Sequence, residues 1–521
     1  PRVTEPQAVA EHHALGEALP LRVGFAGKRG RAFYGGGVQA KGPASEDLDV
    51  LVAEPDTDPR AIGSARAAGA LVVGRAEGAA GVPGADLQIG APAEGVMAAA
   101  PALDPVVYNP TGFRDSGVAG VAAVLTRVGD GFEQGFGLIA HTAHDEPVTV
   151  LAPPGAELPA IPPGASCARF DARTRQPQAV RRAGEHLGVL DHPSFHASEL
   201  ERAGWIAKLC AAGVPVVAAG ISDSLAELLG ADLCRVLDGL RARDLADLDL
   251  RERASVALRR AALRDHSAQA RWRQICAAAG IGLPGPPMVS VVFATRRESW
   301  LEHGIAQVQR QTYEPRELVV CLHGDDFPAG TSERIRALYD GPLKVLRVAG
   351  ELTLGDALNA GVEAAQGELV TKMDDDDYYS TEHLWDLVLA LEYSQADLVG
   401  KAAEFVYLEE IDVTVRQISH DVDTRMAGGG MMARRKELRE LGGWPQRSRG
   451  EDLALIRRFA DAGRPIRRIP PHGYILNRHG VDHTWRPQVD YFLFRSEHQW
   501  RGLGFDVTAI EPPADPHTRI P

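Results

Sequence analysis

Cysteine is scarce in this sequence, with five residues among 521, and no two of them form a C-x-x-C pair. They are scattered along the chain at Cys167, Cys210, Cys234, Cys276 and Cys321. This spacing indicates neither a disulfide framework nor a zinc site, and it fits a protein of a reducing compartment.

Long apolar runs are also missing. The sequence contains no stretch of about 18 apolar residues, which excludes a helix that spans a membrane. The first residues lack the charged and then apolar pattern of a secretion signal. We therefore expect a cytoplasmic protein without a transmembrane segment.

An excess of positive charge is the third absence. Lys and Arg number 56 against 70 Asp and Glu, which gives a net charge of −14. Proteins that bind nucleic acids normally carry a basic surface. General binding to nucleic acid is thereby excluded, whereas a local basic cleft for a phosphorylated substrate is not.

The residues that are present are typical of a globular protein, with 45% hydrophobic and 24% charged side chains in a chain long enough for about three domains. Short apolar runs at 21–26, 48–52 and 70–73 alternate with alanine-rich helical segments. This alternation predicts an α/β subdomain with a parallel sheet over residues 1–145. Strands at 188–191 and 214–218, around a helix at 198–212, predict a second α/β subdomain over residues 146–285.

The run Leu283-Pro284-Gly285-Pro286-Pro287 combines helix breakers with a rigid Pro-Pro pair and therefore predicts a linker. We expect a third α/β domain over residues 286–490. A C-terminal helix and tail are expected over residues 491–521, with an amphipathic helix running from Val489 to about Trp500.

Polar residues of the third domain follow predicted strands, at the point where each strand ends. The strands are expected at 288–294, at 317–322 and directly before the acidic run. Thr295, His323, Asp325 and the run Asp374-Asp375-Asp376-Asp377 come after them. Ligands of open α/β sheets bind at the carboxyl ends of the strands, so these residues are expected to share one site.

The four consecutive carboxylates of Asp374 to Asp377 repel one another when they are held close and partly desolvated. A cation that prefers oxygen ligands, such as Mg²⁺, Mn²⁺ or Ca²⁺, would remove that cost. The alternative is a solvated acidic turn whose charge favours the amino end of the following helix.

A second candidate feature is the helix predicted to begin at Gly450. Asp452 shares one face of this helix with Leu455, Ile456 and Phe459, at the spacing i, i+3, i+4 and i+7. A carboxylate on an apolar face is costly unless it is paired or catalytic. The alternative is that Glu451 and Asp452 only cap the helix.

Together these motifs resemble those of family 2 inverting glycosyltransferases, which have the GT-A fold. The motifs that match are Asn359-Ala360-Gly361, Ala365-Gln366-Gly367-Glu368, Met373-Asp374-Asp375-Asp376-Asp377, and Glu451-Asp452 after Gly442-Gly443-Trp444. The match covers about residues 288–485. It implies a Rossmann-like domain that moves a sugar from a nucleoside-diphosphate sugar to a hydroxyl group with the help of Mn²⁺ or Mg²⁺.

The resemblance also implies residue roles. Asp452, next to Glu451, is the implied general base, and Asp374 and Asp376 are the implied DXD pair. The implied metal ligands are Asp376, Asp374, His479 and His483. The implied donor-binding residues are Thr295, Arg297, His323, Asp325, Asn359, Asp374, Asp375, Gly429 and Gly430.

The sequence does not decide which nucleotide sugar is the donor or which molecule is the acceptor. The family places an aspartate that reads the donor base where this chain has Leu322, followed by His323. A UDP-sugar is favoured, and a GDP- or dTDP-sugar is compatible with the sequence. The acceptor can be a saccharide, a lipid-linked molecule or a small molecule, and a homo-oligomer is compatible as well.

A second resemblance lies in the N-terminal part. The segment Ala211-Ala212-Gly213-Val214-Pro215-Val216-Val217-Ala218 is similar to one in the C-terminal half of GT-B glycosyltransferases. The paired glutamates of that family would fall near Leu200 and Lys208 and are missing here. The resemblance thus implies a pair of GT-B-like subdomains without the GT-B activity.

Two other functions are weighed against sugar transfer. A GT-A-like nucleotidyltransferase is disfavoured because Thr295-Arg296-Arg297 holds no glycine after the first strand of the domain. A non-catalytic scaffold with a structural ion is disfavoured because an ion at the acidic run does not explain why Asp452 lies on the apolar face of its helix.

Overall fold

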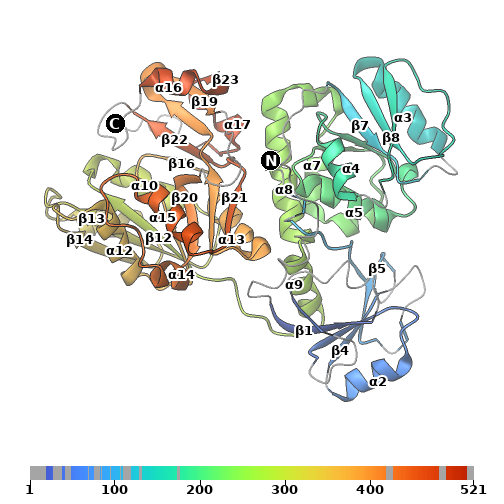
Figure 1. Cartoon of the computed structure of the whole chain (residues 1–521), viewed down its shortest axis with the longest axis horizontal. Helices are drawn as coiled ribbons and strands as arrows, with labels where there is room; N and C mark the ends of the chain where they lie inside the picture. Colours follow the sequence, from blue (N-terminus) through green and yellow to red (C-terminus); the bar gives the residue numbers. More distant parts are fainter. Residues whose placement is uncertain are drawn as a thin grey trace. The chain divides into compact units, whose positions relative to one another are not determined.

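The computed structural model divides the chain into unit 1, residues 1–284, and unit 2, residues 285–521, and each unit is considered by itself (Figure 1). The structure describes residues 19–26, 38–41, 48–68, 70–75, 82–83, 85–93, 96–105, 107–108, 119–127, 132–172, 176–417, 426–479 and 488–512.

The first sheet of unit 1 has six parallel strands in the order β2-β1-β3-β4-β5-β6. They are β1 (Leu19–Phe25), β2 (Val38–Lys41), β3 (Val50–Ala53), β4 (Leu71–Arg75), β5 (Leu87–Gly90) and β6 (Val96–Ala98). The central strands are rich in valine, which suits strands that are buried on both faces.

Two helices cover opposite faces of this sheet. Helix α2 (Pro59–Ala67) places Ile62 and Ala65 against one face. Helix α9 (Ala268–Ala278), from the far end of unit 1, places Trp272 and Ile275 against the other. The core of the first sheet is therefore completed only by the last helix of the unit.

The second sheet of unit 1 has five parallel strands in the order β11-β10-β7-β8-β9. They are β7 (Val121–Val124), β8 (Val148–Ala152), β9 (Ala165–Arg169), β10 (Val189–Asp191) and β11 (Val216–Ala218). Because β7 pairs with β8, the sheet begins at residue 121, and the division expected between residues 145 and 146 lies inside it.

The remaining helices of unit 1 pack around the second sheet or beside it. They are α3 (Phe132–Asp145), α4 (Gln176–Ala183), α5 (Glu199–Ala211), α6 (Asp223–Leu229), α7 (Ala231–Asp238) and α8 (Leu248–His266). Arg202 on α5 donates to Asp191 at the end of β10 over 2.8 Å and to Gly220 O over 2.8 Å, so this buried pair fixes α5 to the sheet.

Unit 2 contains a seven-stranded sheet in the order β14-β13-β12-β15-β20-β17-β21. Its strands are β12 (Val289–Thr295), β13 (Arg316–His323), β14 (Leu343–Val348), β15 (Leu369–Lys372), β17 (Leu398–Ala402), β20 (Met426–Arg434) and β21 (Ile466–Ile469). Strand β20 runs antiparallel to both of its neighbours, β15 and β17. The strands expected at 288–294, at 317–322 and directly before the acidic run are confirmed as β12, β13 and β15.

Helices cover both faces of this sheet. On one face, Val292 of β12 packs with residues of α12 (Leu354–Ala364), α14 (Arg435–Glu440) and α15 (Glu451–Asp461). The neighbouring Phe293 points to the other face, where it meets Gly304 of α10 (Leu301–Gln309). Helices α11 (Thr331–Leu338) and α13 (His383–Ser394) complete the layer structure.

A smaller sheet with the order β16-β22-β18-β19-β23 completes unit 2. Its strands are β16 (Tyr378–Tyr379), β18 (Phe405–Leu408), β19 (Val413–Gln417), β22 (Tyr474–Arg478) and β23 (Ser496–Arg501). The expected helix from Val489 to Trp500 is wrong in extent. Helix α16 stops at Leu493, and β23 follows as an edge strand paired with β19; a last short helix is α17 (Phe505–Thr508).

The predicted α/β class with Rossmann-like parallel sheets is confirmed in both units. The likeness of unit 1 to a pair of GT-B subdomains stays a prediction. Across the described ranges, every helix is too short or too polar to traverse a lipid bilayer.

Ile275 tests the role of α9. Its side chain is fully buried against the first sheet, and replacement by alanine leaves a cavity. Ile275→Ala should lower the free energy of unfolding of unit 1 by about 2–5 kcal/mol. The matched control is Ile281→Ala, which removes the same atoms from a partly exposed position beside the same core. Calorimetric melting measures both, and equal effects would contradict this packing.

His266 predicts an acid sensitivity of unit 1. Burial, helped by the charge of Arg271, lowers the pKa of His266 to about 4. Its Nε2 donates to Leu229 O over 3.0 Å, and Arg271 donates to Nδ1 over 3.2 Å, so the folded ring is neutral. Below about pH 6.5 the unfolded chain takes up a proton that the folded unit refuses until about pH 4, so stability falls as the pH is lowered through this window.

His266→Gln should therefore remove about 2 kcal/mol of the stability difference between pH 7.5 and pH 5. Denaturant unfolding at both pH values measures this, with the exposed His141→Gln as control. Unchanged acid sensitivity in the His266 variant would refute the prediction.

Candidate active site

The acidic run Asp374 to Asp377 follows β15 directly and lies at the carboxyl edge of the seven-stranded sheet. Asp375, Asp376 and Asp377 are buried, whereas the Asp374 side chain is 30% exposed. The four carboxylates do not form a solvated turn, because each has its own set of partners. The solvated-turn alternative is therefore excluded.

Asp375 and Asp376 are held by Arg297. Thr295 Oγ1, at the end of β12, donates to Asp375, and Arg297 donates to the same carboxylate through Nε over 3.1 Å and through Nη2. Arg297 Nη2 also lies 3.0 Å from Asp376 Oδ2. Burial opposes the charge of Arg297, but the two carboxylates outweigh burial and raise its pKa. Of the strand-end residues expected to share one site, Thr295 lies with the acidic run, and Arg297 joins them.

His479, one residue after β22, joins this cluster. Its Nε2 lies 3.0 Å from Asp376 Oδ2 and 3.0 Å from Arg297 Nη1, and its ring packs against that of Trp300. His483 lies outside the described residues. The histidine and the acidic run, a hundred residues apart in the chain, are therefore adjacent in the fold.

Asp377 serves the fold around the site. Its carboxylate accepts hydrogen bonds from Tyr474 Oη over 2.6 Å and from the backbone N–H of Asn477 over 2.9 Å. Burial and the neighbouring Asp376 raise its pKa well above the ordinary value. This carboxyl joins the small sheet to the large one and has no solvent-facing surface to offer a ligand.

Lys372, the last residue of β15, connects the acidic run to α15. Its Nζ lies 2.8 Å from Asp452 Oδ2, 3.3 Å from Asp374 Oδ1 and 3.7 Å from Glu451 Oε1, and its side chain is only 5% exposed. Burial raises the pKa of Asp374 to about 7; Lys372 opposes this rise, while the charges of Asp452 and Asp376 add to it. Asp452 and Asp376 are therefore both close enough to Asp374 for their charges to raise its pKa.

Asp452 lies on the inward face of α15, as expected. Leu455, Ile456 and Phe459 on that face are buried, and Asp452 itself is 22% exposed at the start of the helix. Trp444 Nε1 donates to Asp452 Oδ1 over 3.2 Å. Lysine and tryptophan therefore fix the two oxygens of the carboxylate from different sides.

Asn359 acts behind this arrangement. Its amide donates to Trp444 O over 2.9 Å and accepts from Trp444 N–H over 2.8 Å. Both ends of the side chain are engaged in positioning the Trp444 backbone, which in turn positions the ring beside Asp452. The sequence implies that Asn359 binds the donor, but in the structure its amide group is already used to hold the Trp444 backbone.

The three glycines of β20 differ in what they approach. A Cβ on Gly428 would lie 1.9 Å from Asp452 Oδ2, and one on Gly429 would lie 2.4 Å from Tyr379 Oη and 3.0 Å from Asp374 Oδ2. A Cβ on Gly430 would instead meet Lys401 at 3.3 Å, away from these carboxylates. Close packing of backbone against the site therefore requires glycine at 428 and 429.

His323 is the last residue of β13, and Asp325 follows the strand; both precede the acidic run by many residues in the sequence. Arg296 Nη2 lies 2.7 Å from His323 Nε2, which is also 2.9 Å from Leu352 O. The buried His323 therefore holds the segment after β14. Asp325 is exposed, near Gly350, and its predicted contact with the donor stays a prediction.

Sequence reasoning missed four side-chain or backbone features of the site: Lys372, Trp444, Tyr379 and Gly428. Lys372 had a detectable signal, because a lysine inside an apolar strand next to four carboxylates must be paired to be buried. Trp444 belongs to the Gly442-Gly443-Trp444 motif, but the sequence does not show that its ring donates a hydrogen bond to Asp452, because that contact depends on the fold.

The possible metal-ligating atoms of this site suit a hard divalent cation. Asp376 Oδ2 and His479 Nε2 face each other at 3.0 Å, and carboxylate and imidazole are acceptable ligands of Mn²⁺. In the described ranges no set of three His, Cys, Asp or Glu side chains forms a metal-binding group. Divalent cations that bind phosphates can be held by one or two protein ligands together with phosphate oxygens and water. The ligand atoms of Asp376 and His479 fit an ion of this kind.

Comparison with known proteins locates the family in unit 2. The family model described as "Glycosyl transferase family 2" matches residues 290–461. Two proteins of Bacillus subtilis (strain 168) are similar. "Uncharacterized glycosyltransferase EpsJ" is 30% identical over 115 residues, which is 22% of this chain and 33% of that protein. "Uncharacterized glycosyltransferase YwdF" is 32% identical over 133 residues, which is 25% of this chain and 47% of that protein. The chain spans less than half the length of these relatives.

Solved structures give weaker similarities. TarS 1–349 of S. aureus in complex with UDP-GlcNAc has 16% identity and a TM-score of 0.32, over 39% of this chain and 63% of that one. The mannosyltransferase PcManGT of Pyrobaculum calidifontis, in complex with GDP-Man and Mn²⁺, has 19% identity and a TM-score of 0.31, over 39% and 59%.

Lys372 should stabilise unit 2 through its three carboxylates. Lys372→Met leaves buried negative charge without its partner and should lower the free energy of unfolding by about 3–5 kcal/mol. Adding Asp452→Asn should recover part of this loss, because the two residues interact. Urea unfolding measures the cycle, with exposed Lys436→Met as control. Strict additivity of the two substitutions would contradict the pairing.

Proposed function

Residues 290–461 are a family 2 glycosyltransferase domain, and we propose that its site moves a sugar from a nucleoside-diphosphate sugar to an acceptor hydroxyl with inversion at the anomeric carbon. The observation that carries this proposal is the contact of Lys372 with both Asp374 and Asp452. It supports one shared site for the acidic run and the helix-borne carboxylate.

Asp452 is the proposed general base, with Glu451 beside it. Each oxygen of the Asp452 carboxylate receives one donor, Lys372 on Oδ2 and Trp444 on Oδ1, and each keeps a lone pair for an incoming hydroxyl. A base held in a single orientation transfers a proton efficiently when the hydroxyl is within hydrogen-bond reach. The deprotonated acceptor oxygen then attacks the anomeric carbon on the side opposite the departing diphosphate.

Asp376 and His479 are the proposed ligands of the cation, Mn²⁺ or Mg²⁺, with Asp374 close by. When bound, the cation would neutralise charge that develops on the departing diphosphate. Arg297 supports the same task, because its guanidinium lies beside Asp376 and places a positive charge where the departing diphosphate would lie.

Donor binding is assigned to the carboxyl ends of β12, β13 and β15. Asp374 has the most exposed carboxylate of the acidic run and is the proposed acceptor for a donor hydroxyl. Gly429 leaves room beside β20 for the Asp374 carboxylate and would serve the donor through it, whereas Gly430 faces Lys401. The base of the nucleotide would lie near His323 and Asp325, with UDP favoured over GDP or dTDP.

Asp452→Asn should lower kcat about 10²- to 10⁴-fold, because an amide cannot accept the acceptor proton. The matched control is Asp461→Asn, an exposed carboxylate on the same helix, which should retain full activity. Release of nucleoside diphosphate from a panel of UDP-, GDP- and dTDP-sugars measures the rate. A fully active Asp452→Asn protein would exclude this base.

Asp376→Ala should raise the Mn²⁺ concentration that gives half-maximal activity at least tenfold, because one of two protein ligands is lost. His479→Ala should shift the same midpoint. Titration of Mn²⁺ into the EDTA-treated protein measures it, and the Asp461→Asn protein is again the control. Full activity in excess EDTA would favour a cation-free reaction in which Arg297 alone faces the diphosphate.

A further inference from the structure

The chain as a whole is acidic, but the segment around the proposed base is basic. Residues 434–468 contain 11 Lys and Arg against 5 Asp and Glu, whereas the full chain has a net charge of −14. The segment includes α14, the loop 445–450 and α15, on which Asp452 lies. A local excess of positive charge attracts anions, so the surface beside Asp452 is a candidate for an anionic ligand.

Two arginines of this segment are exposed and unbonded. Carboxylates or backbone carbonyl groups already hold several of the other basic side chains, which are Arg435, Arg439, Arg458, Arg464 and Arg468. The side chains of Arg447 and Arg449 are exposed, and neither guanidinium makes a hydrogen bond or ion pair within the described ranges. The loop directly before α15 therefore presents two guanidinium groups whose donors are available.

The acidic side chains next to these arginines are buried or already bonded. Glu451 is 8% exposed and lies 3.7 Å from Lys372 Nζ, and Asp452 lies 2.8 Å from the same nitrogen. Asp356, on the neighbouring helix α12, accepts from Thr353 N–H over 3.0 Å and from Thr353 Oγ1 over 2.7 Å. These carboxylates are thus directed to Lys372 or to the start of α12, while the arginines of the loop present their charge to solvent.

The loop that carries the two arginines is held in place. Arg447 N–H donates to Pro445 O over 2.8 Å, and Arg447 O accepts from Gly355 N–H over 3.4 Å. Gly355 lies so close to Pro445 O that a Cβ could not fit between them. The ring of Pro445 restricts the backbone further. A loop held in this way loses little conformational freedom when a ligand binds to it.

Both arginines lie within reach of a molecule that meets Asp452. Arg449 precedes Asp452 by three residues, so their Cα atoms are at most about 11 Å apart, and the limit for Arg447 is about 18 Å. Arg457, which is also exposed, follows Asp452 by five residues and lies about 140° around α15 from it. An acceptor at Asp452 can therefore extend to the loop, whereas Arg457 lies on another face of the helix.

We propose that the acceptor of the sugar-transfer site is a phosphorylated sugar or polyol whose phosphate binds Arg447 and Arg449. This inference rests on the proposed function, because a hydroxyl of the same molecule would meet Asp452. Arginine suits phosphate, since its planar guanidinium can donate two parallel hydrogen bonds. A phosphate fits better than a carboxylate here, because it has enough oxygens to serve both guanidinium groups at once.

Matched pairs of acceptors test the proposal: glucose and glucose 6-phosphate, N-acetylglucosamine and its 6-phosphate, and glycerol and glycerol 3-phosphate. Calorimetric titration of the full chain measures the Kd of each probe, and release of nucleoside diphosphate measures transfer. The phosphorylated member of at least one pair should bind at least tenfold more tightly than its neutral counterpart, because it gains charge-assisted hydrogen bonds.

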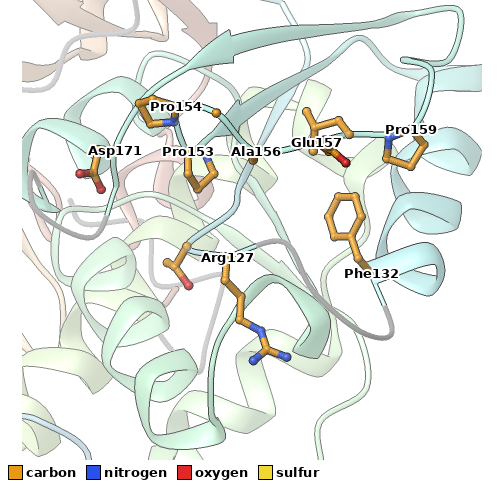
Figure 2. Close-up of a pocket in the computed structure, with 11 residues that line it drawn as sticks. Arg127, Phe132, Pro153, Pro154, Ala156, Glu157, Pro159 and Asp171 are labelled. Atoms are coloured by element: carbon orange, nitrogen blue, oxygen red, sulfur yellow. The ribbon is translucent and has the colours of Figure 1, made fainter.

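The joint substitution Arg447→Gln and Arg449→Gln should raise the Kd of that phosphorylated probe at least tenfold. Arg457→Gln removes a similarly exposed arginine and should bind the probe as the wild type does. A second control concerns unit 1, where Figure 2 shows Arg127 among the residues that line a cavity of about 800 Å³. Arg127→Gln detects any phosphate that binds there instead. Melting curves confirm that each variant is folded.

Preferential binding of phosphorylated probes that depends on Arg447 and Arg449, but not on Arg457 or Arg127, would establish the acceptor class. Three results would overturn it: equal binding of neutral and phosphorylated probes, no binding of any phosphorylated probe at millimolar concentration, or binding unaffected by the joint substitution.

Asp452→Asn separates this inference from the proposed function. The variant should lose transfer and still bind the phosphorylated probe, because the loop arginines are intact. An active transferase that ignores the two arginines contradicts the acceptor class alone, whereas full transfer by the Asp452→Asn protein contradicts the proposed function.

Discussion

The buried ammonium of Lys372 is the constraint on which the site of unit 2 depends. It lies within 3.7 Å of carboxylates from two distant segments, the acidic run after β15 and the start of α15. Charges this deeply buried are tolerated only when opposite charges compensate them. The lysine therefore keeps Asp374 and Asp452 together, and any chemistry that uses both depends on it.

A second layer of contacts makes this geometry rigid. Asn359 holds the Trp444 backbone, Trp444 holds Asp452, and the glycines at 428 and 429 leave the space that these carboxylates fill. On the other side Arg297 joins Asp375 to Asp376 and reaches His479. Such preorganisation is what a site for proton and group transfer requires, since small displacements of reacting groups cost large factors in rate.

The sequence predicted the parts of this arrangement that depend on local pattern. Buried strands, the inward face of α15 and the clustering of strand-end residues all follow from periodicity and from the rule for parallel sheets. The role of Lys372 was not predicted, because lysine is usually exposed and because its partners Asp452 and Glu451 come from another element. Gly428 and Gly430 look alike in sequence and would share a face of a regular strand; they face different neighbours because the pairing of β20 with β17 is irregular between Met426 and Met431. Strand β23 was not predicted because its residues are polar apart from Trp500, so the sequence has no alternation that would indicate a strand.

A crystal structure of the chain with a nucleoside diphosphate and Mn²⁺ tests the central claim most directly. It should contain the metal ion on Asp376 and His479, the diphosphate beside Arg297, and the Asp452 carboxylate facing the same space, still bonded to Lys372. A nucleotide bound away from Asp376, or an Asp452 carboxylate that opens onto a different surface from the diphosphate, would contradict the account.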